Sequence, residues 1–210
     1  MPLSVVTLQL GPMENNTYLV ADPQTGEAAV VDPSFNSLSV VEEAARHGWT
    51  LTQVWLTHAH FDHIAGVRTV AESSQPPLPV GLHAEDLPLW KQGGGARFFG
   101  MQVDPGPAPS ITFTHGQALT LGGQTLEVRH TPGHTQGHVV LYAPGSGFVL
   151  CGDLIFYHGV GRTDLPGGNH DTLLQSIREH ILTLPPTTRL LCGHGPETTV
   201  EEEEQENPFL

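Results

Sequence analysis

Three imidazoles and a carboxylate lie within six consecutive residues of this chain, in the run Thr57-His58-Ala59-His60-Phe61-Asp62-His63. Imidazole nitrogen and carboxylate oxygen are ligands that suit zinc, iron and manganese. In an extended segment, side chains two residues apart point to the same side, so His58 and His60 would face one metal ion. The apolar Trp55 and Leu56 before the run indicate the end of a buried strand, which argues against a surface cluster of histidines. We therefore predict a metal site here.

The chain has 210 residues, of which 38% are hydrophobic, so it can enclose a sizeable core in one domain. No apolar run approaches the roughly 18 residues that are needed to cross a bilayer. The N-terminus lacks the basic segment followed by an apolar segment that is typical of a signal peptide. We therefore expect a cytoplasmic location and no membrane partner. Cys151 and Cys192 lie in apolar, strand-like runs, so we expect buried free thiols rather than a disulfide framework.

The formal net charge is −14 at pH 7, and six glutamates lie in the last fourteen residues. The rest of the chain is still acidic, which argues against contacts with phosphate backbones, because these depend on clusters of Lys and Arg. We expect no nucleic-acid partner. We predict one domain over residues 1–196, followed by a short, solvated acidic tail over residues 197–210.

Apolar patterning and turn residues predict many short strands and four helices. Strands are expected over residues 4–10, 17–21, 27–32, 50–56, 79–83, 111–113, 119–121, 125–130, 139–143, 148–151 and 189–192. Helices are expected over residues 37–46, with Ser37 as the cap, and over 62–73, 84–91 and 171–184. Residues 92–109 are rich in glycine and proline and predict a long loop, either flanking a cleft or without function.

Three further polar residues stand where a predicted strand runs into a glycine-rich turn. They are His134 in the segment 131–138, Asp153 after Cys151-Gly152, and His194 after Cys192-Gly193. Each one alone is compatible with a buried polar group that has only structural partners. Beside the first cluster, however, we predict that they are further metal ligands, because ligands at strand ends converge on one edge of a sheet sandwich.

Taken in order, these motifs resemble those of the metallo-β-lactamase superfamily, and within it the hydroxyacylglutathione hydrolase (glyoxalase II) branch. The resemblance covers residues 3–196 or so and implies an α/β (α+β) fold, a four-layer αββα sandwich whose catalytic site lies at one edge between the sheets. It implies that His58, His60 and His134 bind one metal ion, that Asp62, His63 and His194 bind a second, and that Asp153 bridges them. An aspartate at the bridging position, rather than a cysteine or serine, resembles the hydrolases more than the antibiotic-degrading members.

Two divalent metal ions are the cofactors that the resemblance implies, with zinc first and iron or manganese as alternatives. They would hold a bridging hydroxide that attacks a thioester such as S-lactoylglutathione. Asp62 would orient this hydroxide and Asp153 would hold both ions, so these two carboxylates are the candidate catalytic residues.

Arg162 and Tyr157 are candidates for contact with a small-molecule substrate. Arg162 lies in the segment 161–169, which matches a loop of short glyoxalase II-like proteins and of the related persulfide dioxygenases. Its guanidinium could bind an anionic group of the substrate, or it could brace the loop through Asp164. Asp32 is expected to support the histidine loop from beneath rather than to bind metal.

The chain departs from full-length hydroxyacylglutathione hydrolases after its last histidine. Those enzymes carry an extra helical domain with basic residues for glutathione, whereas this chain ends sixteen residues after His194 and resembles the compact members. Glutathione recognition is therefore not implied residue by residue. A mononuclear iron persulfide dioxygenase is an alternative, as are a lactonase, another metallo-hydrolase and a metal-binding module without catalysis. The acyl group, the thiol carrier, the native metal and the oligomeric state stay open.

Overall fold

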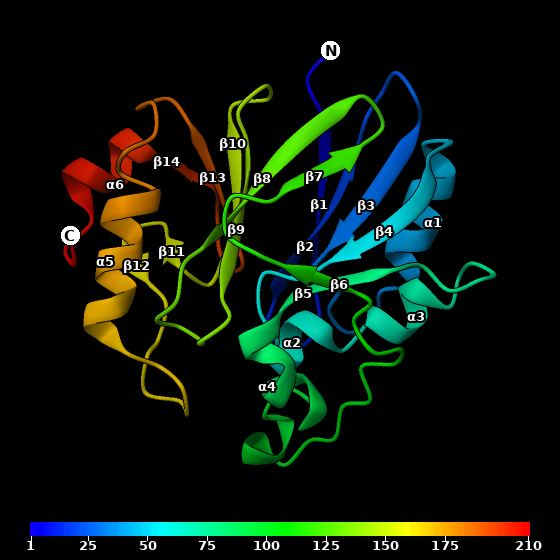
Figure 1. Ribbon diagram of the computed structural model, residues 1–210, viewed down its shortest axis with the longest axis horizontal. Helices are drawn as coiled ribbons and strands as arrows, with labels where there is room; N and C mark the ends of the chain where they lie inside the picture. Colours follow the sequence, from blue (N-terminus) through cyan, green and yellow to red (C-terminus); the bar gives the residue numbers. More distant parts are fainter.

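Two mixed β-sheets of six strands each form the centre of the computed structural model, which describes residues 1–210 (Figure 1). The first sheet has the order β1-β2-β3-β4-β5-β6, contributed by Ser4–Leu10, Asn15–Ala21, Glu27–Val31, Thr50–Trp55, Val80–His83 and Ile111–Phe113. The second has the order β14-β13-β10-β9-β8-β7, contributed by Thr198–Thr199, Arg189–Cys192, Phe148–Gly152, Val139–Ala143, Gln124–His130 and Ala118–Leu121. A separate hairpin pairs β11 (Ile155–Phe156) with β12 (Gly159–Val160). The sequence predicted most of these strands, but not β11, β12 or β14.

The two sheets pack face to face around an apolar core. Side chains from both sheets meet in this layer, among them the fully buried Trp55, Phe113, Leu126 and Leu141. Successive residues of a strand point to opposite faces of its sheet. Trp55 of β4 therefore enters this central core, while Val54 enters a second apolar layer on the outer face of the first sheet.

Helices cover the outer face of each sheet, as Figure 1 shows. The helices α1 (Leu38–Arg46) and α3 (Val67–Ala71) bury their apolar residues against the first sheet. The helices α5 (His170–His180) and α6 (Val200–Glu206) do the same against the second sheet. The four-layer αββα sandwich is therefore confirmed. No helix combines the length and the apolar character that a bilayer crossing requires.

The helix expected over residues 62–73 is two short helices in the structure, α2 (Phe61–Ile64) and α3. They are separated at Gly66, whose amide donates to the carbonyl of Pro33 at 2.8 Å instead of to the residue four positions earlier. A side chain at Gly66 would also collide with Ser37. Ser37 does not cap α1 through its side chain as predicted, because its hydroxyl donates to a backbone carbonyl three residues before it, at 2.5 Å. A tertiary contact therefore decides where α2 ends.

The connection between β5 and β6 contains only short helical turns. The predicted helix over residues 84–91 is a 3-10 turn, η1 (Ala84–Asp86), followed by α4 (Leu87–Lys91). The glycine- and proline-rich stretch over residues 92–109 is a long loop, as predicted, with one 3-10 turn, η2 (Ala96–Phe99). Part of this loop lies over the candidate site described below.

The end of the chain is part of the packed fold, contrary to the prediction of a solvated tail over residues 197–210. Strand β14 pairs with β13, and α6 follows it with Glu203 fully buried. The Glu203 carboxylate accepts hydrogen bonds from the side chains of Thr198 and Asn207, at 2.7 Å each. It also accepts one from the backbone amide of His158, at 3.0 Å. This one carboxylate therefore ties the end of the chain to the β11–β12 hairpin, which the acidic composition alone did not reveal.

Glu203→Ala is expected to lower the free energy of unfolding by about 3 kcal/mol, because it leaves three donors without their acceptor in a buried place. Glu204→Ala, on the exposed side of the same helix, should change it by less than about 0.5 kcal/mol. Urea unfolding of the two variants measures the difference. Equal midpoints would show that the buried carboxylate contributes nothing.

Candidate metal centre

The seven residues that were predicted from the sequence to be metal ligands lie together at one edge of the sandwich, between the two sheets. His58, His60, Asp62 and His63 follow β4, His134 follows β8, Asp153 follows β10 and His194 follows β13. Strands β10 and β13 are parallel, so their carboxyl ends lie at the same edge and bring Asp153 and His194 together. The loop after β4 joins the second sheet directly, because the Val139 amide donates to the carbonyl of Thr57 at 2.8 Å.

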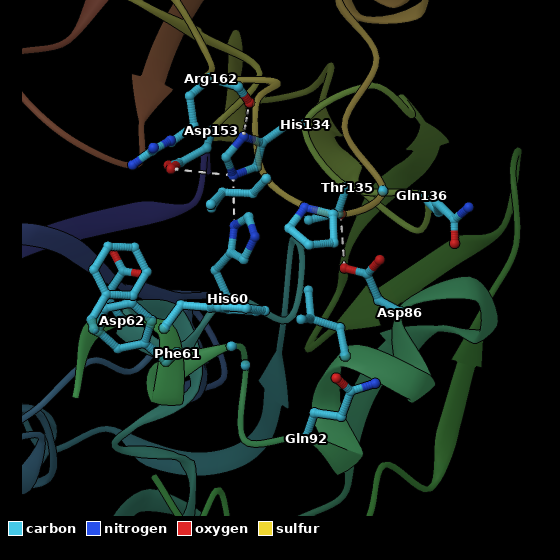
Figure 2. Close-up of a pocket in the computed structure, with 18 of the residues that line it drawn as sticks. His60, Phe61, Asp62, Asp86, Gln92, His134, Thr135, Gln136, Asp153 and Arg162 are labelled. Carbon is cyan, nitrogen blue, oxygen red and sulfur yellow. Dashed lines mark hydrogen bonds and ion pairs between the residues drawn. The ribbon is translucent and has the colours of Figure 1, made fainter. Parts of the chain in front are cut away.

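His58, His60 and His134 form the first group, and a ring nitrogen of each lies within 4.8 Å of the others. Nδ1 of His60 lies 2.8 Å from Nε2 of His134, and Figure 2 shows the two rings pointing toward each other. The other nitrogen of His134, Nδ1, donates to the carbonyl of Arg162 at 2.7 Å. Nδ1 of His58 lies 3.0 Å from the hydroxyl of Thr57. In both His134 and His58 the Nδ1 atom therefore has a partner outside the cluster, which leaves Nε2 to face a ligand at the centre of the group.

Asp62, His63 and His194 form the second group, with ligand atoms that also lie within 4.8 Å of one another. Oδ2 of Asp62 lies 3.2 Å from Nε2 of His194 and 3.8 Å from Nε2 of His63. The opposite ring nitrogens are held from outside. Nδ1 of His63 faces the Asp32 carboxylate at 3.0 Å, and Nδ1 of His194 donates to the carbonyl of Met13 at 3.0 Å. These contacts direct both Nε2 atoms toward Asp62.

Asp153 lies between the two groups. Its Oδ2 is 3.6 Å from Nε2 of His134 in the first group and 3.7 Å from Nε2 of His194 in the second. Its Oδ1 is 3.2 Å from Nε2 of His63. This approach requires glycine at position 193, because a Cβ on Gly193 would collide with both Asp153 and His63. Asp153 thus stands where the resemblance to the family expects a bridging ligand.

The donor atoms of this cluster fit divalent cations. Nε2 of His58 is buried and has no hydrogen-bond partner, which is costly for a polar atom unless a cation satisfies it. Burial lowers the pKa of His58 well below its ordinary value and that of His60 to about 3. Both rings are therefore neutral, which is the form that binds a metal ion.

The second group has an excess of negative charge. Burial lowers the pKa of His63, but the charges of Asp153 and Asp62 outweigh burial and raise this pKa well above its ordinary value. The same carboxylates outweigh burial at His194, where the hydrogen bond to Asp62 contributes most to the rise of the pKa. Protons or metal cations can supply the positive charge that these carboxylates require, so the two compete for the same position.

Asp32 supports the loop after β4 from beneath, in the role that the sequence predicted. Its Oδ1 accepts a hydrogen bond from the Thr57 amide at 2.8 Å, and its Oδ2 accepts one from the Thr57 hydroxyl at 2.6 Å. His138 supports Asp153 in the same way, because its Nε2 accepts a hydrogen bond from the Asp153 amide at 3.2 Å. Its Nδ1 lies 2.9 Å from the Thr131 hydroxyl and donates to it.

Asp86 is a further support, which the sequence analysis missed. Its carboxylate is buried and accepts hydrogen bonds from the Ala59 amide at 2.9 Å, the Thr135 hydroxyl at 2.8 Å and the Gly137 amide at 2.7 Å. It therefore joins the loop after β4 to the loop after β8, which carry the first group of histidines (Figure 2). In the sequence, an aspartate in the first turn of a predicted helix is common at helix N-termini. Nothing in the sequence therefore indicated that Asp86 supports the two loops.

Asp86→Ala is expected to weaken binding of the metal ion at the first group by about tenfold or more, because the two ligand loops lose their shared acceptor. The neighbouring Glu85→Ala is the matched control, since the Glu85 side chain is 57% exposed and should leave metal affinity nearly unchanged. Competition with a chromogenic chelator measures both affinities. Unchanged metal affinity in a folded Asp86→Ala protein would show that Asp86 does not support metal binding at the first group.

A cavity of about 660 Å³ lies over the cluster, with Asp62, Asp153 and three of the histidines in its lining. Arg162 also lines it, but its guanidinium forms two hydrogen bonds of 2.8 Å with Asp164, the loop brace considered in the sequence analysis. Tyr157, the other candidate for substrate contact, does not line this cavity. It stacks on His158 with ring centroids 3.9 Å apart. Its neighbour Phe156, the last residue of β11, lines the cavity instead, whereas Tyr157 lies in the turn of the hairpin.

Comparisons with known proteins agree with this fold and this site. Residues 10–194 match the family model of the metallo-beta-lactamase superfamily. The chain is 39% identical to the "Probable metallo-hydrolase YqgX" of Bacillus subtilis (strain 168), over 97% of this chain and 95% of that protein. It is 29% identical to the "Hydroxyacylglutathione hydrolase GloC" of Haemophilus influenzae, over 99% of this chain and 98% of that protein.

Solved structures show the same likeness. The crystal structure of BLEG-1 B3 metallo-beta-lactamase superposes with a TM-score of 0.92 at 35% identity, covering 99% of both chains. That of TTHA1623 in a di-iron-bound form superposes with a TM-score of 0.88 at 38% identity, covering 98% of this chain and 100% of the other. An αββα sandwich with a His/Asp metal cluster at its edge defines a class of metallo-hydrolases. The chain belongs to the metallo-β-lactamase superfamily.

Proposed function

We propose that the protein is a metal-dependent hydrolase of the glyoxalase II type, which cleaves a thioester. The observation that carries this proposal is the complete set of seven His and Asp side chains beneath an open cavity, with an aspartate between the two groups. The relative named as a hydroxyacylglutathione hydrolase supports it, because the match covers 98% of that protein. That relative is therefore as compact as this chain.

In the proposed centre His58, His60 and His134 would hold one ion, Asp62, His63 and His194 would hold a second, and Asp153 would serve as a ligand shared by both. When bound, the two divalent ions would lower the pKa of a water molecule towards about 7 and polarise the thioester carbonyl. Zinc suits these nitrogen and oxygen donors. The related structure in a di-iron-bound form supports iron as an alternative.

The side chains of the cavity floor position the reaction. In the metal-free protein, burial raises the pKa of Asp62, but the charge of His63 and the hydrogen bond from His194 outweigh burial and lower it; bound cations would act in the same direction. Asp62 is therefore ionised at neutral pH, and its Oδ2 can orient and accept the proton of an attacking water. Phe61 and Phe156 line the cavity beside it and limit access of further water. A thiolate is a good leaving group, so no strong acid from the protein is needed.

A panel of substrates tests this proposal on protein with measured metal content. S-lactoylglutathione hydrolysis should rise with occupancy and reach its maximum near two ions per chain. Oxygen consumption with a glutathione persulfide should be absent, since a mononuclear dioxygenase would leave Asp62, His63 and His194 without a role. No hydrolysis of any thioester by protein that holds two ions would contradict the assignment.

Hydrolysis of a β-lactam is a second candidate, favoured by the TM-score of 0.92 with the structure of a B3 metallo-beta-lactamase. Both reactions add a hydroxide to an activated carbonyl, so the same cluster suits either one. They differ in the leaving group, which is a thiolate in one case and a ring amine in the other. A penicillin, a cephalosporin and a simple lactone therefore belong in the same panel, and the largest kcat/KM decides among these substrates.

A further inference from the structure

Phe98 and Phe99 are exposed aromatic residues on the turn η2, with 73% and 47% of their surface accessible. Both line the cavity over the metal cluster. Two large apolar side chains that share one exposed turn beside a cavity mark a binding surface better than single scattered ones do. The turn is flanked by Gly95 and Gly100, which both have positive φ angles (76° and 71°) that other residues rarely adopt.

This turn is attached to the loop that carries the metal-binding residues. The Phe61 amide donates to the carbonyl of Gly94 at 3.0 Å, and a Cβ on Gly94 would collide with the backbone of Phe61. The rings of Phe61 and Phe99 lie 5.1 Å apart, centroid to centroid. Because Phe61 stands between His60 and Asp62, this contact holds the Phe99 ring close to the proposed centre, and Phe98 lines the cavity from the same turn.

Further apolar side chains line the wall beside polar ones. They include Pro88 and Leu89 of α4, Phe156 and Val160 of the β11–β12 hairpin, and Leu165 and Pro166. These residues come from three separate segments that surround the opening. A hydrocarbon group that extends from the metal cluster would therefore contact apolar side chains on several sides, and their burial would favour its binding.

The wall offers little for a charged tripeptide. Arg162 is the only Lys or Arg that lines the cavity, and its guanidinium is already paired with Asp164. Lys91 and Arg97 of the same region line a separate hollow. Glutathione in a thioester carries two carboxylates and one ammonium group, and its carboxylates would need cations that this wall does not present. The exposed carboxylate of Glu85 in the lining adds repulsion.

We propose that this cavity selects thioesters with a hydrocarbon group beside the scissile bond, and that Phe98 and Phe99 bind that group. This inference rests on the proposed thioester hydrolysis. The shared chemistry is an apolar chain or ring, which could belong to the acyl side or to the thiol side of the substrate. S-lactoylglutathione would be a substrate of low affinity, bound chiefly through its reacting carbonyl.

Three thioesters separate the two sides, assayed with protein that holds two ions. They are S-lactoylglutathione, the phenylacetyl ester of glutathione and the lactoyl ester of benzylthiol. After correction for uncatalysed rates, at least one aromatic ester should exceed S-lactoylglutathione roughly tenfold in kcat/KM, mainly through a lower KM. The ester that gains identifies the side that carries the hydrocarbon group. The highest kcat/KM for S-lactoylglutathione would overturn the inference.

Phe98→Ala and the double variant Phe98→Ala/Phe99→Ala test the residues themselves. The ratio of kcat/KM for the preferred aromatic ester to that for S-lactoylglutathione should fall about fivefold in the single variant and further in the double variant. Phe209→Ala removes a phenylalanine far along the chain whose accessibility, 49%, is close to that of Phe99, and should leave the ratio unchanged. Metal content is measured for each variant. A uniform fall for all three esters would show a structural role and overturn the assignment.

Binding of non-hydrolysable ligands keeps this inference separate from the proposed reaction. The S-benzyl thioether of N-acetylcysteamine should bind the wild-type protein more tightly than S-methylglutathione does, by calorimetry, and should lose about fivefold in affinity with Phe98→Ala. If the aromatic thioether binds in this way while no thioester is hydrolysed, the proposed reaction fails and the apolar selectivity stands. Equal affinity of wild type and variant for the aromatic thioether would overturn the selectivity.

Discussion

Asp153→Ala is expected to lower kcat/KM by about three orders of magnitude, more than His194→Ala does. The reason is geometric, because Asp153 approaches His134 of the first group and both His63 and His194 of the second. Without Asp153, no side chain would hold the two ions at a fixed distance from each other. His194 belongs to one group only, and its side chain is 26% exposed, so its loss should disturb the centre less. Assays of kcat/KM together with metal analysis of the purified variants measure the two effects.

Asp171→Ala is the matched control for this comparison, because it removes an exposed carboxylate from the start of α5. It should keep two ions and full activity. The Asp153→Ala protein should keep fewer ions than the His194→Ala protein under the same conditions. Equal metal content and equal rates in these two variants would remove the bridging role and leave Asp153 as one ligand among seven.

The positions in the cluster could be predicted because each one has a local signal. Four of the residues lie in the run from His58 to His63, and the other three lie in or at the start of the glycine-containing turns that follow β8, β10 and β13. In a sandwich, strands that end at one edge bring such residues together whatever their distance in the chain. The order of the strands within each sheet has no such local signal, and the sequence did not predict it; only the layered αββα arrangement followed from the resemblance to the family.

The supports of the cluster could not be predicted because they depend on contacts between distant segments. Asp86 accepts hydrogen bonds from Thr135 and Gly137, which lie 49 and 51 residues further along the chain. The break between α2 and α3 likewise depends on the contact of Gly66 with Pro33. The buried Glu203 is one of four consecutive glutamates, and only the packed structure distinguishes it from its neighbours.

Removal of the metal ions is expected to abolish hydrolysis and to lower the melting temperature by roughly 20 °C. Each ion that binds only the folded chain, at a thousand times its dissociation constant, stabilises it by about 4 kcal/mol, so two ions contribute about 8 kcal/mol. In a domain of this size each kcal/mol corresponds to about 2–4 °C. Calorimetry during titration with a chelator measures the shift. We expect two steps, because His194 leaves the second group more open to solvent than the buried first group.

The pH dependence of this loss follows from the two histidines of the second group. The pKa values of His63 and His194 are raised in the metal-free protein, so both rings favour the protonated form and an ion must displace those protons. Apparent affinity for the second ion should therefore rise as pH rises and fall as pH falls.

Zinc, iron or manganese should restore the melting temperature, whereas calcium should not, because it prefers six or more oxygen ligands. Retention of one ion at most after reconstitution with each of these three metals would contradict the dinuclear centre.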